Sequence, residues 1–335
     1  MLSILMPALL ACKHPVTPTE TPPDALAWSA LQPATSLAGF VVEGVYTGPD
    51  GRPRGARLRH LHTGFLIRWL EIETVPGAMI AVNTVPPDDR GTPHTQEHLL
   101  LGKGEVGRAV ADAEAYQLVD SSAYTERLRT VYHFRTAAGP DAFFTTLEAR
   151  LHALLEPDYT DTEIRREVYH LGVEGEPGAR RLVEKGTVYN EMMTSSREEG
   201  RILWSRMERD LYGPDHPAAR SSGGDPDAMR MLDPEAIRAF HASSYALGNM
   251  SAVLTLPPGD LEARLTRLDA LLRGLQPEAT PSGATWPSRD TLPSPHAAPD
   301  GPVHVVPYPR REGKGTVSTV LGWPPRGDRM PREAL

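Results

Sequence analysis

Residues 92–102 read Thr-Pro-His-Thr-Gln-Glu-His-Leu-Leu-Leu-Gly, a stretch that predicts a helix carrying two histidines. Thr92 followed by Pro93 is typical of a helix start, with threonine as the N-cap and proline at the first helical position. Gly102 and Gly104 are residues at which helices commonly stop. We therefore expect a helix that begins at about residue 92 and ends near one of these two glycines.

The spacing of His94, Glu97 and His98 predicts a metal site on this helix. Residues four apart lie on the same helical face, so His94 and His98 can present both imidazoles to one ion. Glu97 lies near that face and can reach a metal-bound water without being a ligand. The order His-x-x-Glu-His inverts the more familiar His-Glu-x-x-His motif. The motif arises by chance in roughly one chain in thirty of this composition, and two exposed histidines on a polar helix face are the alternative interpretation.

A third ligand has to be another histidine or a carboxylate from elsewhere in the chain. There is one cysteine, Cys12, so a zinc site cannot be built from thiolates. Glu184 and Glu191 are seven residues apart, and a helix over 180–195 would place both carboxylates on one face. Charged residues at this spacing usually form a solvated helix face, so the spacing alone leaves both interpretations open.

These motifs resemble the pitrilysin and insulin-degrading-enzyme family of inverted zinc peptidases, with the presequence-protease branch the most similar. The resemblance rests on the run from His94 to His98 followed by Val188-Tyr-Asn-Glu-Met192. Further similar blocks within residues 36–275 are Ser122–Thr125, Arg129–Tyr132, Tyr212–Pro214, Ser222–Pro226 and Phe240–Asn249.

The resemblance implies a zinc-dependent metalloendopeptidase that hydrolyses peptides and holds one Zn²⁺ per chain. His94, His98 and Glu191 would be the zinc ligands, and Glu97 the general base that activates a zinc-bound water. Glu184 matches a supporting acidic position, where a carboxylate orients a ligand. For Glu184 alone, a plain surface carboxylate is the alternative.

The same resemblance assigns a substrate-binding edge strand. Ala123, Tyr124 and Thr125 would offer backbone groups to an extended peptide, which then adds a strand to the sheet. A plain core or edge strand without a substrate is the alternative interpretation of these three residues.

The surrounding sequence predicts an α+β fold, with helices packed on a largely antiparallel sheet. Short β-rich segments bounded by Gly, Pro or Asp predict strands, and apolar residues at helical spacing predict helices. The expected strands are Phe40–Tyr46, Ala56–Leu61, Phe65–Glu71, Met79–Val85, one or two within Ser121–Thr136, and Met250–Leu256. The expected helices, besides the first, are 140–156, 160–172, 180–195, 197–211, 233–243 and 259–274.

Changes in composition predict the domain organisation. Residues 36–275 would form a pitrilysin-like zinc peptidase domain, and the stretch 276–302, rich in Pro, Ser, Thr and Ala, is typical of a linker. Residues 303–335 would be the start of an incomplete second, similar domain, with strands at Val303–Pro307 and Thr316–Trp323.

The first residues predict a location for the protein. Residues 1–12 form an apolar stretch that ends Leu-Leu-Ala-Cys, and it is too short for a membrane-spanning helix, which needs about 20 residues. The pattern resembles a bacterial lipoprotein signal, with a lipid anchor at Cys12 and residues 13–35 as a polar tether. We therefore expect a cell-envelope protein, lipoprotein-anchored or periplasmic or extracellular; without such a signal the chain would be cytoplasmic.

Charge and family resemblance together indicate the partners. The formal net charge is -8 and there is no basic run, which excludes the usual signature of nucleic-acid binding. The expected partner is a peptide substrate. The resemblance implies that a second chain or a missing C-terminal half completes the substrate chamber and supplies an Arg and a Tyr that hold the substrate. The alternative functions are a non-catalytic peptide-binding or assembly subunit, and a membrane-tethered structural lipoprotein.

Overall fold

The computed structural model describes Trp28, residues 31–281, and a few short stretches beyond them, namely 284, 286, 291–294, 304–307 and 318–322. The predicted signal segment with Cys12 and most of the predicted tether lie outside the described residues. The described residues of the two strands expected after residue 302 are in neither a helix nor a strand. The domain boundaries at 275 and 302 stay predictions.

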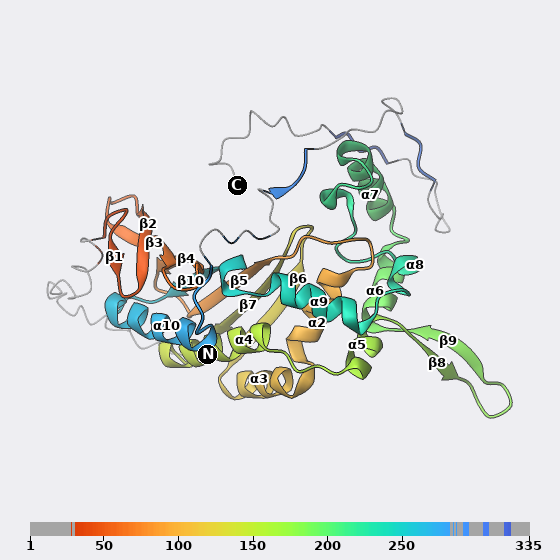
Figure 1. The fold of residues 1–335 in the computed structure, drawn as a ribbon, viewed down its shortest axis with the longest axis horizontal. Coiled ribbons are helices and arrows are strands. Elements are labelled where there is room, and N and C mark those ends of the chain that lie inside the picture. Colours follow the sequence, from red (N-terminus) through yellow and green to blue (C-terminus); the bar gives the residue numbers. More distant parts are fainter. Residues whose placement is uncertain are drawn as a thin grey trace, which may run out of the picture.

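The described chain is built on an eight-stranded sheet with the order β1-β2-β3-β4-β10-β5-β7-β6 (Figure 1). Every neighbouring pair is antiparallel except β4 with β10, which is parallel. The predicted α+β fold with a largely antiparallel sheet is confirmed. The strands are β1 Ser36–Leu37, β2 Phe40–Thr47, β3 Pro53–His60, β4 Leu66–Glu71, β5 Gly77–Asn83, β6 Val119–Thr125, β7 Arg129–Thr136 and β10 Met250–Leu256.

Strand β10 lies in the middle of the sheet, although among the described residues it is the last strand in sequence. It pairs with β4 on one side and β5 on the other, so residues separated by more than 160 positions become neighbours. Its side chains alternate between buried and half-buried, which is the pattern of a strand with one face on the core. All the helices that carry the candidate site lie between β5 and β10 in sequence, so the pairing of these two strands fixes both ends of that region.

The helices cover the sheet and extend beyond its β6 edge (Figure 1). In the core, α4 and α10 pack on each other, and their apolar side chains join the buried side of the sheet in one cluster that includes Phe143, Leu147, Leu265 and Trp69. None of the described helices is both long and apolar enough to cross a membrane. The helices are α2 Thr92–Gly102, α3 Gly104–Tyr116, α4 Pro140–Leu155, α5 Asp161–Val168, α6 Thr187–Ser195, α7 Glu199–Tyr212, α8 Pro226–Met229, α9 Pro234–Ser244 and α10 Leu261–Leu275.

Two expected helices were partly wrong. The helix expected over 160–172 ends at Val168, and the first part of the helix expected over 180–195 is a strand. Strands β8 (His170–Glu174) and β9 (Arg181–Lys185) pair as an antiparallel hairpin that projects from the body of the molecule (Figure 1). Pairing with the preceding strand β8 overrides the helix-forming composition of residues 181–185. Helix α3 was not predicted.

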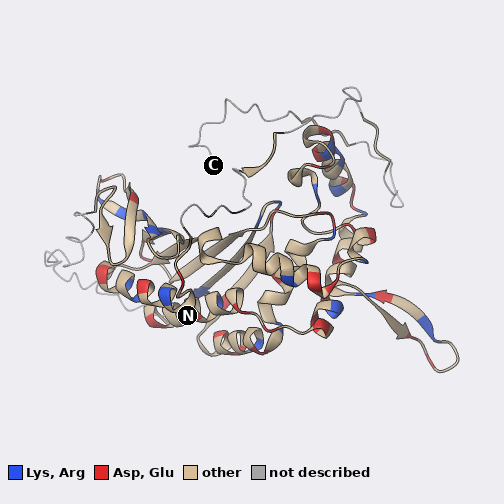
Figure 2. Cartoon of the chain, in the orientation of Figure 1, with Lys and Arg blue, Asp and Glu red and all other residues tan. Residues whose placement is uncertain are grey.

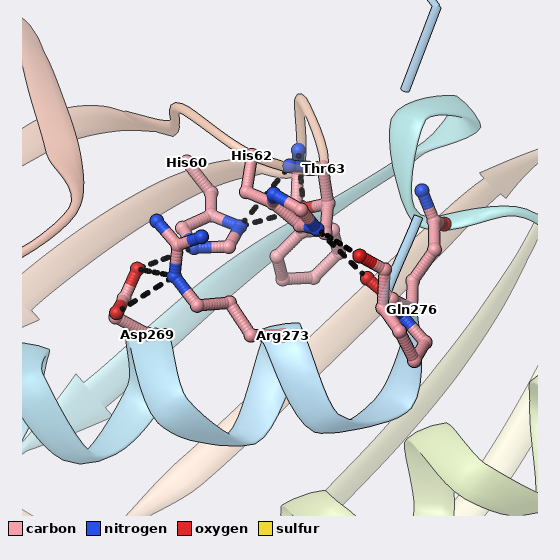
Figure 3. A network of polar contacts seen from close by, with 8 residues as sticks. His60, His62, Thr63, Asp269, Arg273 and Gln276 are labelled. Atoms are coloured by element: carbon pink, nitrogen blue, oxygen red, sulfur yellow. Dashed lines mark hydrogen bonds and ion pairs between the residues drawn. The ribbon is translucent and has the colours of Figure 1, made fainter. Parts of the chain in front are cut away.

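A buried histidine connects the β3–β4 turn to α10 through hydrogen bonds. His60 is fully buried, and its Nδ1 and Nε2 atoms each lie 2.8 Å from an oxygen, Oγ1 of Thr63 and Oδ1 of Asp269 respectively (Figure 3). Arg273 donates to the same carboxylate from one turn along α10. Burial lowers the pKa of His60, which opposes the effect of Asp269. This network satisfies the hydrogen-bonding groups of a histidine inside the core.

Candidate metal centre

Helix α2 presents its two histidines because its N-terminus is held against a distant loop. The N-cap is Gly91, with φ 75°, and not Thr92 as expected, so Thr92 is the first helical residue and Pro93 the second. A Cβ on Gly91 would lie 2.6 Å from the carbonyl oxygen of Gly223, so glycine permits this close approach. The same carbonyl lies 3.3 Å from Nδ1 of His94. This contact leaves Nε2 of His94 for a ligand on the other side of the ring.

His98 is oriented in a similar way by a carboxylate from α5. Its Nδ1 lies 3.5 Å from Oε2 of Glu167, which is buried to all but 5%. The other oxygen of Glu167 lies 2.7 Å from Nζ of Lys103, the residue between α2 and α3. A buried carboxylate held by both a lysine and a histidine ring is a strong orienting partner. Nε2 of His98 is therefore left facing the same space as Nε2 of His94.

Glu191 on α6 completes a three-residue cluster. Its Oε1 lies 3.7 Å from Nε2 of His94, and its Oε2 lies 3.6 Å from Nε2 of His98. One ligand atom from each of the three residues lies within 4.8 Å of the others. The sequence-predicted ligands are thus brought together by two helices that are separated by more than eighty residues of chain.

Glu97 lies beside the cluster and is held from the sheet. Its side chain is buried to all but 6%, and its Oε2 accepts a hydrogen bond of 2.6 Å from the hydroxyl of Thr125 at the end of β6. Thr125 lies in turn 3.2 Å from the hydroxyl of Thr130 on β7. One oxygen of Glu97 is thus fixed by the sheet, and its carboxylate stays next to the histidines of its own helix.

The electrostatics of the cluster favour one neutral and one more basic histidine. Burial and the neighbouring His98 lower the pKa of His94, against the opposing pull of Glu191 and Glu97. Burial also acts to lower the pKa of His98, but Glu167, Glu97 and Glu191 outweigh it and raise that pKa. Glu167 itself has a pKa of about 2, because His98, Lys103 and Thr187 together outweigh the cost of its burial.

Two nitrogens and one carboxylate oxygen are the donor set of a catalytic zinc site with an open fourth position. The Nδ1 atom of each histidine already faces a fixed oxygen, and this is the usual arrangement behind a histidine ligand. The residues therefore fit a zinc ion. Nitrogen and carboxylate donors in this number also favour zinc over magnesium or calcium, which prefer oxygen ligands.

Glu184 does not lie on the helix that was expected to carry both it and Glu191. It belongs to β9 and not to the helix of Glu191, because Gly186, with φ 148°, separates the two elements. Its carboxylate accepts from the hydroxyls of Tyr169 and Tyr189 and from Arg230. These contacts hold the pKa of Glu184 at about 2, chiefly through Arg230. Through Tyr189 the contacts of Glu184 reach α6, and they do not include a zinc-ligand candidate.

Glu167 is the residue that sequence reasoning missed at the site. It lies in the expected helix after 160 but carries no recognisable spacing to the histidine motif. Lys103 lies between the two glycines at which the helix was expected to end, and no spacing relates it to the site. The signal that could have identified them is their position in the folded chain, where α5 crosses the end of α2.

Ala123, Tyr124 and Thr125 lie on β6, at the edge of the sheet as the structure describes it. In the part of the chain that is described, β6 pairs with β7 alone, so its outer side is free of a strand. Thr125 lies at the end nearest Glu97. Their role as a substrate edge stays a prediction.

The chain is similar in sequence to known peptidases. No family model matches the chain. A protein named mitochondrial presequence protease from Eremothecium gossypii is 31% identical over 252 residues, which cover 73% of this chain and 25% of that protein. The chain thus spans about a quarter of the length of this curated relative.

Solved structures show the same fold at lower identity. The crystal structure of pitrilysin has a TM-score of 0.54 at 17% identity, covering 74% of this chain and 26% of that chain. A peptidase M16 inactive domain from Pseudomonas fluorescens has a TM-score of 0.51 at 16% identity, covering 76% of this chain and 53% of that chain. Because that domain is described as inactive, the fold alone does not establish activity.

The comparisons also correct the expected location. Several of the relatives are named mitochondrial presequence proteases, which contradicts the prediction of a cell-envelope lipoprotein. The motif, the sheet, the clustered residues and the named relatives agree on one further point: the chain belongs to the pitrilysin and insulin-degrading-enzyme family of peptidases.

Proposed function

We propose that this chain carries the zinc centre of a metalloendopeptidase that hydrolyses peptides. The observation that supports the proposal best is the convergence of Nε2 of His94, Nε2 of His98 and the carboxylate of Glu191, with Glu97 beside them. His94, His98 and Glu191 would hold the metal, and Glu97 is left as the acid–base group.

The roles of the protein's groups follow from where they are held. When bound, zinc would lower the pKa of a coordinated water toward neutrality and polarise the carbonyl group of the scissile bond. Glu97 takes the proton of the attacking water at its carboxylate and passes it to the leaving amine nitrogen. Thr125 keeps the Glu97 carboxylate in place through its 2.6 Å hydrogen bond. Gly223 and Glu167 keep the two imidazole rings turned toward Glu191.

Strand β6 supplies a means of placing an extended peptide. Its outer edge can form backbone hydrogen bonds with a substrate, as Ala123, Tyr124 and Thr125 were expected to do. Because Thr125 also bonds to Glu97, a peptide paired with β6 would pass beside the acid–base group.

We also propose that a second half completes the substrate chamber, either as further chain or as a separate subunit. The support is that matching peptidases are about four times as long as the matched region. This same observation favours the alternative function, a non-catalytic peptide-binding or assembly subunit. The buried and hydrogen-bonded state of Glu97 favours the peptidase, since an assembly subunit has no need to hold a carboxylate there.

Zinc content and peptide hydrolysis test the proposal together. The chain should bind one zinc ion, and His94→Ala or Glu191→Ala should each abolish that binding. Glu97→Gln should retain zinc while hydrolysis of a fluorogenic peptide falls at least about a hundredfold, the low end of what a general base contributes. Turnover that survives Glu97→Gln would rule out Glu97 as the general base. A chain that binds no zinc would rule out the proposed zinc centre. Zinc binding with no turnover, in this chain and in a full-length relative bearing the same motif, would establish the alternative.

A further inference from the structure

A cavity of about 810 Å³ lies next to the candidate metal centre. Its walls come chiefly from four segments: the end of β6 with the residues after it, the end of α6, helix α7, and the loop 219–226. Val306, in the described stretch 304–307, also lines it. Three of these segments touch the centre directly. Thr125 on β6 bonds to Glu97, α6 carries Glu191, and the loop holds His94 through Gly223. A group in the cavity is therefore within reach of a peptide at the centre.

The walls of the cavity carry several arginines, and most of them already have partners. Arg127 pairs with Glu208, Arg206 with Asp210, and Arg209 with Asp89. Arg220 uses its two terminal nitrogens on the backbone carbonyls of Pro86 and Asp215. Figure 2 shows basic and acidic residues side by side along α7, which carries Arg206 and Arg209. General positive charge is therefore not what distinguishes the cavity.

Arg201 differs from the others in its surroundings. It is half-buried, and its Nη2 donates a 3.2 Å hydrogen bond to the hydroxyl of Ser221. Within the described residues it forms no ion pair, although Glu198 and Glu191 act on it from a distance. Burial lowers the pKa of its guanidinium, because the charged group is partly removed from water. A bound anion would offset this loss of solvation.

Arg201 also faces the loop that orients His94. A Cβ on Gly223 would lie 3.1 Å from Nη2 of Arg201, so the guanidinium is packed against this glycine. The carbonyl of the same glycine contacts the ring of His94. Gly223 thus lies between the guanidinium of Arg201 and a candidate zinc ligand, His94. This position suits a substrate group near the bond to be cut.

We propose that this cavity is a substrate subsite for a carboxylate, received by Arg201 with Ser221 beside it. The proposal rests on the proposed peptidase function and adds a preference to it. The carboxylate is either an Asp or Glu side chain or the C-terminal carboxylate of the peptide. Arginine suits both, because its planar fork of donors matches a carboxylate in two parallel hydrogen bonds.

Peptide binding to the full chain tests this subsite without turnover. The probes are fluorescein-labelled Ala/Leu decapeptides with one Glu placed at each position in turn, their matched Gln peptides, and free-acid and amidated versions of the Gln set. The zinc-loaded Glu97→Gln chain is used, with the zinc-free wild-type chain as a second preparation in case the substitution disturbs folding. A Glu side chain in one register, or a free C-terminus, should bind about tenfold more tightly than its uncharged match, as for a hydrogen bond between charged groups.

Arg201→Gln should remove this preference and leave zinc affinity unchanged. Arg206→Gln is the matched control, since it lies on the same helix, removes the same charge, and belongs to an arginine already paired with Asp210. Loss of the preference in both variants, its survival in Arg201→Gln, equal binding of charged and uncharged peptides, or no peptide binding at all would each overturn the subsite. Failure of the wild-type chain to take up zinc would instead overturn the proposed function, and the peptide preference would still be measurable on the zinc-free chain.

Discussion

Glu167 lies 3.5 Å from Nδ1 of His98, although the two residues come from different helices and the carboxylate is nearly buried. Lys103 holds the opposite oxygen of that carboxylate at 2.7 Å. The contact fixes which nitrogen of His98 faces Glu191. Part of the metal centre is thus built from groups that do not themselves reach the metal position.

Replacing Glu167 with glutamine should therefore weaken zinc binding. We expect the zinc dissociation constant to rise about 10- to 100-fold, the usual cost of losing a carboxylate behind a histidine ligand. Competition with a chelating indicator on the purified chain measures it. Glu148→Gln removes the same charge from an exposed position on α4 and should leave the constant unchanged. An unchanged constant in Glu167→Gln, with a normal unfolding transition, would show that Glu167 has no orienting role.

Thr125→Val should separate catalysis from metal binding. The valine keeps the shape of the side chain but removes the hydroxyl that donates to Glu97, so the carboxylate loses its fixed position. We expect peptide hydrolysis to fall about tenfold, a fraction of what a general base contributes, while zinc affinity stays the same.

Thr125→Ser, which keeps the hydroxyl, is the matched control and should recover most of the activity. If valine and serine behave alike, the hydrogen bond to Glu97 does not matter for turnover. If zinc affinity falls with activity in the valine variant, Thr125 acts on the metal centre and not on the acid–base group.

The sequence could predict the features of this site that depend on residues close together in the chain. His94, Glu97 and His98 lie within one helical turn and a half, so their shared face followed from helix geometry. Most strands were also predicted, because each has β-rich composition and is bounded by turn residues.

What depended on distant contacts could not be predicted in the same way. The spacing of Glu184 and Glu191 suggested one helix, but Gly186 and the pairing of β9 with β8 place the two glutamates in different elements. Glu167 has no sequence relationship to His98 at all. The central place of β10 is likewise set by its pairing with β4 and β5 and not by its own composition.

Gly186→Ala should disturb the third ligand position from outside the site. Gly186 has φ 148°, and a Cβ there would lie 2.2 Å from the carbonyl oxygen of Val168 on α5. The clash would move the start of α6 and with it Glu191. We expect a loss of stability of about 1–3 kcal/mol together with weaker zinc binding, measured by urea unfolding and chelator competition.

Gly178→Ala is the matched control for that change. Gly178 also has a positive φ, of 94°, but a Cβ there would meet open space. It should lose some stability through backbone strain and keep its zinc affinity. Equal zinc affinity in the two variants would mean that α6 tolerates the displacement, and that the position of Glu191 does not depend on Gly186.

Glu163→Gln should reveal how the acid stability of the chain depends on α5, the helix that carries Glu167. Glu163 and Thr160 form a capping box, and Glu163 also accepts from the backbone of Gly104 and from Arg108. Against the cost of its partial burial, these contacts lower its pKa from 4.5 to about 2, with the backbone of Thr160 the largest cause. Since the folded-state pKa is the lower one, Glu163 stabilises the fold fully above its unfolded pKa. This contribution is lost as the pH falls from 4.5 toward about 2.

The difference in unfolding free energy between the wild-type chain and Glu163→Gln should therefore be constant above about pH 5.5 and should shrink steadily below 4.5. At neutral pH we expect it to be about 1 kcal/mol, the usual value of a helix cap. Urea unfolding followed by circular dichroism at a series of pH values measures the difference, with Glu148→Gln as the exposed control. If the difference stays constant down to about pH 3, the carboxylate of Glu163 titrates alike in the folded and unfolded chain, and the capping box does not hold α5 in place through its charge.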